Sequence, residues 1–214
     1  MKQRILIFTG GRLGDWATKL VQPQDYLIGA DSGALFLVRN GFTPDIAIGD
    51  FDSVTEDELA EIRIHSKELI DCDPIDKDFT DTEMAFRRAL EQQPAEISLI
   101  GALGTRFDHS LANVHLLSLA LEQGISATII DEHNQIRLAQ GPLTLPLNKG
   151  NYAHVSLLPL SQRVTGIYLT GFQYPLSDAT LRIGQSLGIS NVILGDNGTI
   201  QFAEGVLLVI QSKD

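Results

Sequence analysis

The chain lacks a second cysteine and has no apolar run long enough to cross a bilayer. Because Cys72 has no partner, no disulfide can form within the chain, which suits a reducing compartment. The first apolar run, Ile5–Phe8, stops at Thr9, too soon for the core of a signal peptide. We therefore expect a cytoplasmic protein with no membrane partner.

Basic residues are also scarce. The chain has 16 lysines and arginines against 27 aspartates and glutamates, which gives a net charge of −11. A nucleic acid partner would need a basic surface, so this balance argues against that class of ligand. An acidic protein binds a polyphosphate only when a bridging cation or a local group of donors offsets the repulsion. The histidines lack zinc-site spacing, and the Gly-x-Ser-x-Gly turn of many serine hydrolases is absent.

Short apolar runs alternate with helical patterns over about the first 130 residues. Near-continuous apolar runs predict parallel strands buried on both faces. These runs are Ile5–Phe8, Tyr26–Ala30, Ile46–Ile48, Ile97–Ile100 and Ala127–Ile130. Capping residues predict helices that start near Ser32, at the pair Ser53 and Glu56, near Asp78 or Thr80, and after Asp108. This alternation is typical of an α/β domain with a mostly parallel sheet and flanking helices.

The pattern changes near Gly141. Turn signals such as Asn148-Lys149-Gly150 then separate short strand-like segments, which predict a small antiparallel β-sandwich domain. The segments are Leu143–Leu147, Ala153–Leu158, Val164–Leu169, Asn191–Leu194, Thr199–Phe202 and Val206–Gln211. We expect residues 1–138 to form the first domain and residues 139–214 the second.

Polar residues and glycines follow four of the predicted parallel strands. The carboxyl ends of such strands meet at one edge of the sheet, where ligands bind in open α/β folds. We therefore expect these residues to converge, although they are far apart in sequence. They are Gly10-Gly11, Asp31-Ser32-Gly33, Gly49–Ser53, Gly101 and Gly104–His109, and the segment Asp76–Asp81 can join the same edge.

Asp50 and Asp52 are the strongest metal-ligand candidates. In extended backbone, two residues with this spacing point to the same side. Their repulsion would raise one pKa unless a cation neutralises them, and Mg²⁺ binds one or two carboxylates together with phosphate oxygens. A turn with a helix cap would use the same residue types. The position after a buried strand, with Asp31 and Asp81 expected nearby, favours the metal site.

Two other segments give less specific signals. Asp76–Asp81 contains three carboxylates, which fit either a solvated acidic loop or further metal and hydroxyl contacts. Arg106–His109 combines a phosphate-type donor, an acceptor and an imidazole, but it also fits a helix start. Gly10 and Gly104 would allow the backbone to approach a phosphate.

Together these motifs resemble the thiamine pyrophosphokinase family over essentially the whole chain. The matching stretches are Ala30–Ala34, Gly49–Ser53, Asp78–Asp81, Gly101–Asn113, Val155–Leu160, Gly171–Leu176 and Gly188–Asn191. The resemblance implies an ATP-binding α/β domain and a β-sandwich that contributes to a thiamine site. It also implies a homodimer with active sites at the subunit interface. The implied reaction moves the β,γ-diphosphoryl group of ATP to the hydroxyl of thiamine and releases AMP, with Mg²⁺ as cofactor.

The resemblance also implies roles for particular residues. The implied Mg²⁺ site consists of Asp50 and Asp52, with Asp78 and Asp81 close by. The implied catalytic residues are Asp50, Asp52, Asp81, Arg106 and Asp108. The implied ATP contacts are Gly10, Asp31, Ser32, Gly33, Asp78, Thr80, Gly104, Arg106 and His109. The implied thiamine contacts are Asp108, Ser190 and Asn191. Ser32 departs from the family, which often has a second glycine there.

Two other functions share part of the pattern. A metal-dependent nucleotide-sugar transferase would also use Asp50 and Asp52, but it does not require Asp78–Asp81 or Arg106–His109. A non-catalytic module would bind a magnesium nucleotide without turnover. The number of carboxylates expected at one edge favours catalysis. The sequence does not decide whether Asp108 or Asp81 accepts the proton of the attacking hydroxyl.

Overall fold

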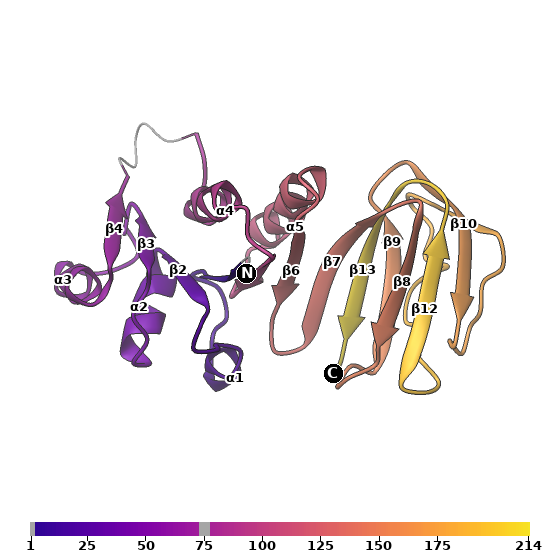
Figure 1. Ribbon diagram of the computed structural model, residues 1–214, viewed down its shortest axis with the longest axis horizontal. Coiled ribbons are helices and arrows are strands. Elements are labelled where there is room, and N and C mark those ends of the chain that lie inside the picture. Colours follow the sequence, from indigo (N-terminus) through magenta and orange to yellow (C-terminus); the bar gives the residue numbers. More distant parts are fainter. Residues whose placement is uncertain (1–2, 73–77) are drawn as a thin grey trace. The chain divides into compact units, whose positions relative to one another are not determined.

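The computed structural model describes residues 3–72 and 78–214, and the chain divides into two compact units between Glu132 and His133. The first unit contains β1 (Arg4–Phe8), α1 (Asp15–Thr18), β2 (Tyr26–Ala30), α2 (Ser32–Arg39), β3 (Ile46–Gly49), α3 (Glu56–His65), β4 (Glu68–Asp71), α4 (Asp81–Glu91), β5 (Glu96–Ile100), α5 (Phe107–Glu122) and β6 (Ser126–Ile130) (Figure 1). The second contains β7 (Asn134–Gln140), β8 (Leu143–Asn148), β9 (His154–Pro159), β10 (Arg163–Thr170), β11 (Ala179–Arg182), β12 (Asn197–Phe202) and β13 (Val206–Ser212). The boundary expected between residues 138 and 139 falls inside β7.

The strands of the first unit form a parallel sheet in the order β4-β3-β2-β1-β5-β6. The chain adds strands on one side of β1 as far as β4 and then returns to place β5 on the other side. The order therefore reverses between β1 and β5, which makes their carboxyl ends a preferred place for a ligand. The predicted buried strands are confirmed. The edge strand β4 was missed because its sequence Glu-Leu-Ile-Asp is polar at both ends and only half-buried.

Both faces of this sheet are covered by helices. Figure 1 shows α4 and α5 on one face and α1, α2 and α3 on the other. Leu6 and Phe8 of β1 pack in one core cluster with α1 and α2, and the Phe8 ring stacks on Phe36 at a centroid distance of 5.9 Å. Ile5 and Ile7 point to the opposite face and are fully buried. Burial on both faces explains the continuous apolar runs.

Two helices begin at residues other than the predicted caps. Ser32 is the first residue of α2, and Asp31 occupies the N-cap position without a side-chain cap hydrogen bond. The capping box of α3 uses Thr55 and Glu58 and not the pair that begins at Ser53. One hydrogen bond explains both differences. Ser53 Oγ donates to Asp31 Oδ2, so the side chains of Ser53 and Asp31 bind each other at the sheet edge and do not cap a helix.

The last two helices of the first unit also clarify the sequence pattern. Thr80, one of two predicted starts, caps α4 by accepting a hydrogen bond from Glu83 N at 3.2 Å. Arg106 occupies the N-cap position of α5, and Asp108 lies in the first turn. Asp108 is therefore a helical residue near the positive end of the helix dipole, where its charge is favourable.

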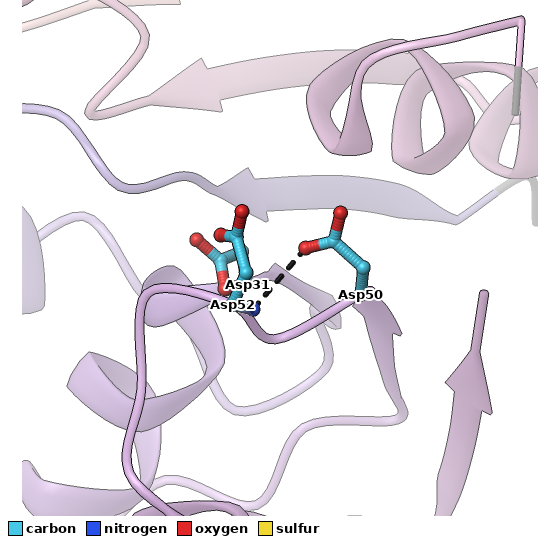
Figure 2. Close-up of side chains that lie close together, drawn as sticks. All are labelled: Asp31, Asp50 and Asp52. Atoms are coloured by element: carbon cyan, nitrogen blue, oxygen red, sulfur yellow. Dashed lines mark hydrogen bonds between the residues drawn. The ribbon is translucent and has the colours of Figure 1, made fainter. Parts of the chain in front are cut away.

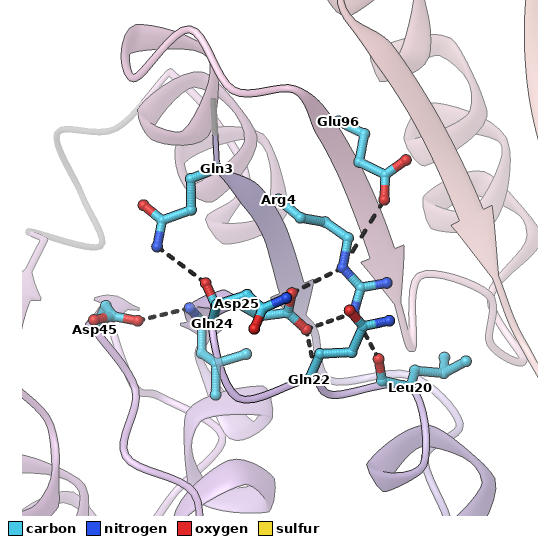
Figure 3. Close-up of polar contacts among 9 residues, drawn as sticks. Gln3, Arg4, Leu20, Gln22, Gln24, Asp25, Asp45 and Glu96 are labelled. Atoms are coloured by element: carbon cyan, nitrogen blue, oxygen red, sulfur yellow. Dashed lines mark hydrogen bonds and ion pairs between the residues drawn. The ribbon is translucent and has the colours of Figure 1, made fainter. Parts of the chain in front are cut away.

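Ion pairs and hydrogen bonds hold the amino edge of the sheet. The Asp25 side chain is 1% exposed and accepts hydrogen bonds from Arg4 Nε at 2.8 Å and from Gln22 N at 2.7 Å (Figure 3). Asp45 accepts a hydrogen bond from Leu27 N at 2.8 Å. These aspartates join neighbouring strands and have their charge or lone pairs satisfied by the protein itself.

The second unit is a β-sandwich, as predicted. One sheet has the order β7-β13-β9 and the other β11-β10-β12-β8, with antiparallel pairing in both. Side chains from the two sheets, such as Leu157, Val209, Ile167 and Ile200, share one buried cluster. The predicted strand Asn191–Leu194 is wrong, because this segment forms only isolated bridges. In the part of the chain that the structure describes, no helix has the length and apolar content that spanning a membrane requires.

Candidate active site

A cleft of about 820 Å³ lies at the carboxyl edge of the parallel sheet. Loops after β1, β2, β3 and β5 line it, together with the start of α4. The structure thus brings together residues that lie in separate parts of the sequence, as the strand order predicted. The predicted site residues that line this cleft are Gly10, Asp31, Asp50, Asp52, Thr80, Asp81, Gly104, Arg106 and His109.

Three carboxylates form a cluster in this cleft. Asp31, Asp50 and Asp52 each offer an oxygen, and these oxygens lie within 4.8 Å of one another (Figure 2). Asp52 N donates to Asp50 Oδ1 at 3.2 Å, which tightens the loop. Between them, Phe51 is 3% exposed and has a φ of 54°, so the expected extended backbone is wrong at this residue. Phe51 packs into the core beside Ile62, which anchors the loop while its neighbours reach the cleft.

Asp31 has an unusual environment within this cluster. Its φ is 52°, a value that costs free energy in residues other than glycine and often marks a functional site. Burial raises the pKa of the Asp31 carboxyl, hydrogen bonds from Ser53 and Ser32 oppose that rise, and the charges of Asp81 and Asp52 add to it. Its Oδ1 atom is buried without a hydrogen-bond partner among the described residues. An unsatisfied oxygen beside two further carboxylates is the donor set that a hard divalent cation prefers.

Asp81 extends this cluster from a different element. It is the first residue of α4, and its Oδ1 accepts a hydrogen bond from Asp50 N at 3.3 Å. A Cβ added to Gly49 would lie 3.2 Å from Asp81 Oδ1 and 3.3 Å from Asp31 N. The absence of a side chain at Gly49 therefore gives the Asp81 carboxylate room beside the loop.

The other side of the cleft carries cationic side chains. Arg106 donates to Asp108 through Nη2 at 2.6 Å and through Nε at 3.2 Å. This two-bond contact, more than any other interaction, lowers the pKa of the Asp108 carboxyl. Both side chains are about two-thirds exposed, at 69% and 65%. Arg106 lines the cleft, whereas Asp108 is not among its lining residues.

Hydrogen bonds connect the loops after β1 and β5. Thr9 Oγ1 donates to Gly101 O at 2.6 Å, and Arg12 N donates to Leu103 O at 3.2 Å. A Cβ on Gly11 would lie 2.0 Å from Gly101 O, so only glycine allows this approach. These contacts fix the backbone from which Arg12 extends.

Sequence reasoning missed several residues of the cleft. Thr9, Arg12, Thr82 and Asn113 also line it. Buried Asn113 donates to Ala102 O at 2.8 Å and so supports the loop after β5. Arg12 directly follows the glycine pair after the first strand, and that position was the available signal. The Gly-Gly-Arg segment matches no standard phosphate-binding fingerprint, so the sequence alone did not predict a role for Arg12.

Other predicted ATP contacts lie behind the cleft wall. Ser32 and Gly33 are in the first turn of α2 and are not among the lining residues. A Cβ on Gly10 would meet Ser32 Oγ at 2.6 Å, and a Cβ on Gly33 would meet Phe8 O at 2.1 Å. Both residues therefore pack against the end of β1 and its loop, which gives them an indirect part in shaping the cleft.

The segment before α4 is only partly described. Asp78 is exposed and is not a lining residue. Asp76 and Lys77, which belong to the same predicted acidic segment, lie outside the described residues. Within the described part, it is Thr80 and Asp81 that reach the cleft.

Ser190 and Asn191 belong to the second unit and behave differently from each other. Asn191 is 5% exposed, and its side chain donates to Tyr174 O at 2.7 Å and accepts from Tyr174 N at 3.0 Å. Ser190 is exposed, has a φ of 56°, and its backbone N donates to Ser156 Oγ. Asn191 thus holds the loop, and Ser190 is exposed on it.

Family comparisons match both units of the chain. The sequence model described as "Thiamin pyrophosphokinase, catalytic domain" matches residues 17–129. The model described as "Thiamin pyrophosphokinase, vitamin B1 binding domain" matches residues 143–207. The first match includes the acidic cluster and Arg106, and the second includes Ser190 and Asn191.

Individual relatives agree with these matches. The chain is 37% identical over 188 residues to the thiamine pyrophosphokinase of Bacillus subtilis (strain 168), which covers 87% of each protein. The crystal structure of thiamine pyrophosphokinase from Bacillus subtilis superposes with a TM-score of 0.91 and 34% identity, covering 99% of this chain and 100% of that one. The thiamin pyrophosphokinase structure from Geobacillus thermodenitrificans gives a TM-score of 0.88 and 33% identity, covering 99% and 98%.

Proposed function

Because this chain belongs to the thiamine pyrophosphokinase family, we propose that it transfers the β,γ-diphosphoryl group of ATP to the hydroxyl of thiamine and releases AMP. ATP is the co-substrate of this enzyme. The observation that carries the proposal is the cleft in the catalytic unit, where Asp31, Asp50 and Asp52 meet at the carboxyl edge of the sheet. The comparisons do not favour the nucleotide-sugar transferase or the non-catalytic module.

We propose Mg²⁺ as the cation of the acidic cluster. Its ligands would come from Asp31, Asp50 and Asp52, with Asp81 beside them, and the buried oxygen of Asp31 supports this assignment. Bound there, the metal would offset the charge of the phosphates and polarise the phosphoryl oxygens. For Asp78, the proposed role near the phosphates is supported only by the family motif, because Asp78 does not line the cleft.

The protein's own residues would then hold and orient the two substrates. Arg106 offers a guanidinium to phosphate oxygens, and the backbones of Gly10 and Gly104 leave space for close approach. The Asp108 carboxylate accepts two hydrogen bonds from Arg106 and is not among the residues that line the cleft. We therefore assign the acceptance of the thiamine hydroxyl proton to Asp81, which lines the cleft, and assign Asp108 to holding Arg106 and the thiamine.

We also propose a homodimer with active sites at the subunit interface and a cytoplasmic location. The second unit exposes several large apolar side chains near Ser190, including Tyr174 at 60%, Leu187 at 62% and Leu194 at 68%. Contact with a second copy would remove this apolar surface from water. In this arrangement Ser190 would contact thiamine, and Asn191 would hold the loop that carries it.

The test is an assay of AMP formation from ATP, Mg²⁺ and thiamine. We expect the protein to form one thiamine diphosphate for each AMP and to be inactive with thiamine monophosphate, which lacks the free hydroxyl. Asp50→Asn should lower kcat by about a hundredfold or more, because preorganised charge at a phosphoryl-transfer site has effects of that order. Its thermal unfolding should remain cooperative. If no thiamine compound gives AMP, or if Asp50→Asn turns over normally at saturating Mg²⁺, the assignment is wrong.

A further inference from the structure

Charge is divided along the edge of the sheet. Asp31, Asp50 and Asp52 follow β2 and β3, on one side of the cleft, and Asp81 lies beside them. The loops after β1 and β5, which meet where the strand order reverses, carry the arginines of the cleft lining, and His109 follows in the first turn of α5. A ligand that carries both a cation and uncovered anionic groups matches this division. Magnesium-bound ATP is such a ligand, because it keeps a net negative charge after one cation is bound.

The two arginines of the cleft lining differ in what they contact. Arg106 forms two hydrogen bonds with Asp108, so a carboxylate already offsets part of its charge. The guanidinium of Arg12 is exposed and has no ion pair with any residue in ranges 3–72 and 78–214. Within the described cleft lining, Arg12 is therefore the strong cation whose charge is left for a ligand.

The backbone beneath Arg12 is held in place. Arg12 N donates to Leu103 O, and Thr9 Oγ1 donates to Gly101 O. Both acceptors lie in the loop after β5. Gly11 lies so close to Gly101 that no side chain fits between them. A long arginine side chain on a fixed base has less freedom to lose when it binds a phosphate.

From these observations we propose that Arg12 is a binding residue for the phosphate chain of ATP, on the side opposite the metal cluster. The proposal rests on the proposed function for the identity of the nucleotide, and it adds a residue that the sequence motifs did not include. Arg12 would bind the phosphate oxygens that the cation leaves uncovered, through charge-assisted hydrogen bonds. It would orient the diphosphoryl group but take no part in proton transfer.

The test compares Arg12→Gln with a matched control, Arg63→Gln. Arg63 is also exposed and also lacks an ion pair among the described residues, but it lies on α3 and not in the cleft. We expect Arg12→Gln to raise the KM for ATP by about 10- to 100-fold, as expected for losing a hydrogen bond to a charged group. The KM for thiamine should stay unchanged, and Arg12→Lys should restore part of the loss because it keeps the charge without the planar fork.

Adenosine separates phosphate binding from a structural effect. As a phosphate-free competitor it should inhibit the wild type and Arg12→Gln with the same Ki. Equal weakening of adenosine and ATP would overturn the proposal, as would a KM for ATP that rises no more than in Arg63→Gln. Calorimetric titration with Mg-ATP, without thiamine, gives a second readout. If the wild type forms no AMP, the proposed function fails, whereas this titration still decides the role of Arg12.

Discussion

Aspartates stand at both edges of the parallel sheet, and the neighbours of each one decide its role. At the amino edge, Asp25 binds Arg4 and Asp45 binds Lys67, at N–O distances between 2.5 and 2.8 Å. These carboxylates are satisfied by cations of the protein and serve stability. At the carboxyl edge, Asp31 keeps a buried oxygen without a partner among the described residues, and this is the pattern of a ligand site.

Asp25→Asn should lower the free energy of unfolding by about 3 kcal/mol, the lower end for removing one partner of a buried pair, because Arg4 is a quarter exposed. The amide would accept fewer charge-assisted hydrogen bonds and would leave the Arg4 charge with the longer contact to Glu96 at 3.9 Å. Urea denaturation of the full chain measures the change. Asp15→Asn, at an exposed position, is the control and should change stability by less than about 0.5 kcal/mol. Equal effects of the two substitutions would contradict the stabilising role of the pair.

Sequence position predicted which carboxylates converge at the sheet edge better than it predicted the cationic lining of the cleft. Asp50 and Asp52 were found because they follow a buried strand, and strand order brings them to Asp31. Arg12 was not found, because one arginine in a loop has no pattern of its own. Its significance depends on contacts with a loop about ninety residues away, and those contacts exist only in the folded chain.

The helices and strands show which local signals tertiary contacts override. Continuous apolar runs predicted the central strands because both faces are buried. The strands β4, β7 and β11 are half-exposed and gave no such run. The start of α3 was expected at Ser53 but uses Thr55, because the Ser53 hydroxyl donates to Asp31. Ser53 thus belongs to the site, and Thr55 caps the helix.

The capping box of α3 should make part of the stability depend on pH. The hydrogen bond from Thr55 N is the largest cause that lowers the pKa of Glu58 below its ordinary 4.5. A carboxylate with a lowered folded pKa adds stability above its unfolded pKa and loses it as pH falls through the folded value. Glu58→Gln should therefore be less stable than wild type at pH 7, and the difference should shrink below about pH 4.5.

Thermal unfolding measured between pH 7 and pH 3 checks this expectation. Glu56→Gln, in the same helical turn, is the matched control, since Glu56 is exposed and forms no capping contact. It removes the same charge from the start of the helix. A difference from wild type that stays constant with pH, or one that is equal for both variants, would rule out the cap as the source.

At the scale of the whole molecule, the change in sequence pattern near Gly141 was enough to predict a sandwich after an α/β unit. The first strand of the sandwich, β7, begins before the pattern change. It was missed because its sequence Asn-Gln-Ile-Arg-Leu-Ala-Gln is largely polar. The proposed homodimer has no local signature in the sequence and rests on the family resemblance. A prediction of subunit contacts needs exposed surfaces, which only the folded chain displays.

Mixing two inactive variants tests the proposed dimer. Asp50→Asn damages the nucleotide site of the first unit, and Ser190→Arg should repel cationic thiamine from the second. If each active site uses one unit from each subunit, hybrid dimers contain one intact site. After subunit exchange, an equal mixture should recover about a quarter of wild-type activity, since half of the dimers are hybrids with one working site. Sedimentation should give a dimer for each variant. A mixture no more active than its components would exclude shared sites.

The fastened loops after β1 and β5 also determine when the site can form during folding. Thr9 and Gly101 are separated by 92 residues, so their hydrogen bond closes a long segment of chain. Closing such a segment costs entropy that only later contacts offset. A nascent chain can pair β1 with β2 early. The loop that carries Arg12 can make its hydrogen bond to Leu103 only after β5 has been synthesised. The acidic loops after β2 and β3 therefore leave the ribosome before the loop after β5 that supports Arg12, so the proposed binding of magnesium-bound ATP would require the first unit to be complete.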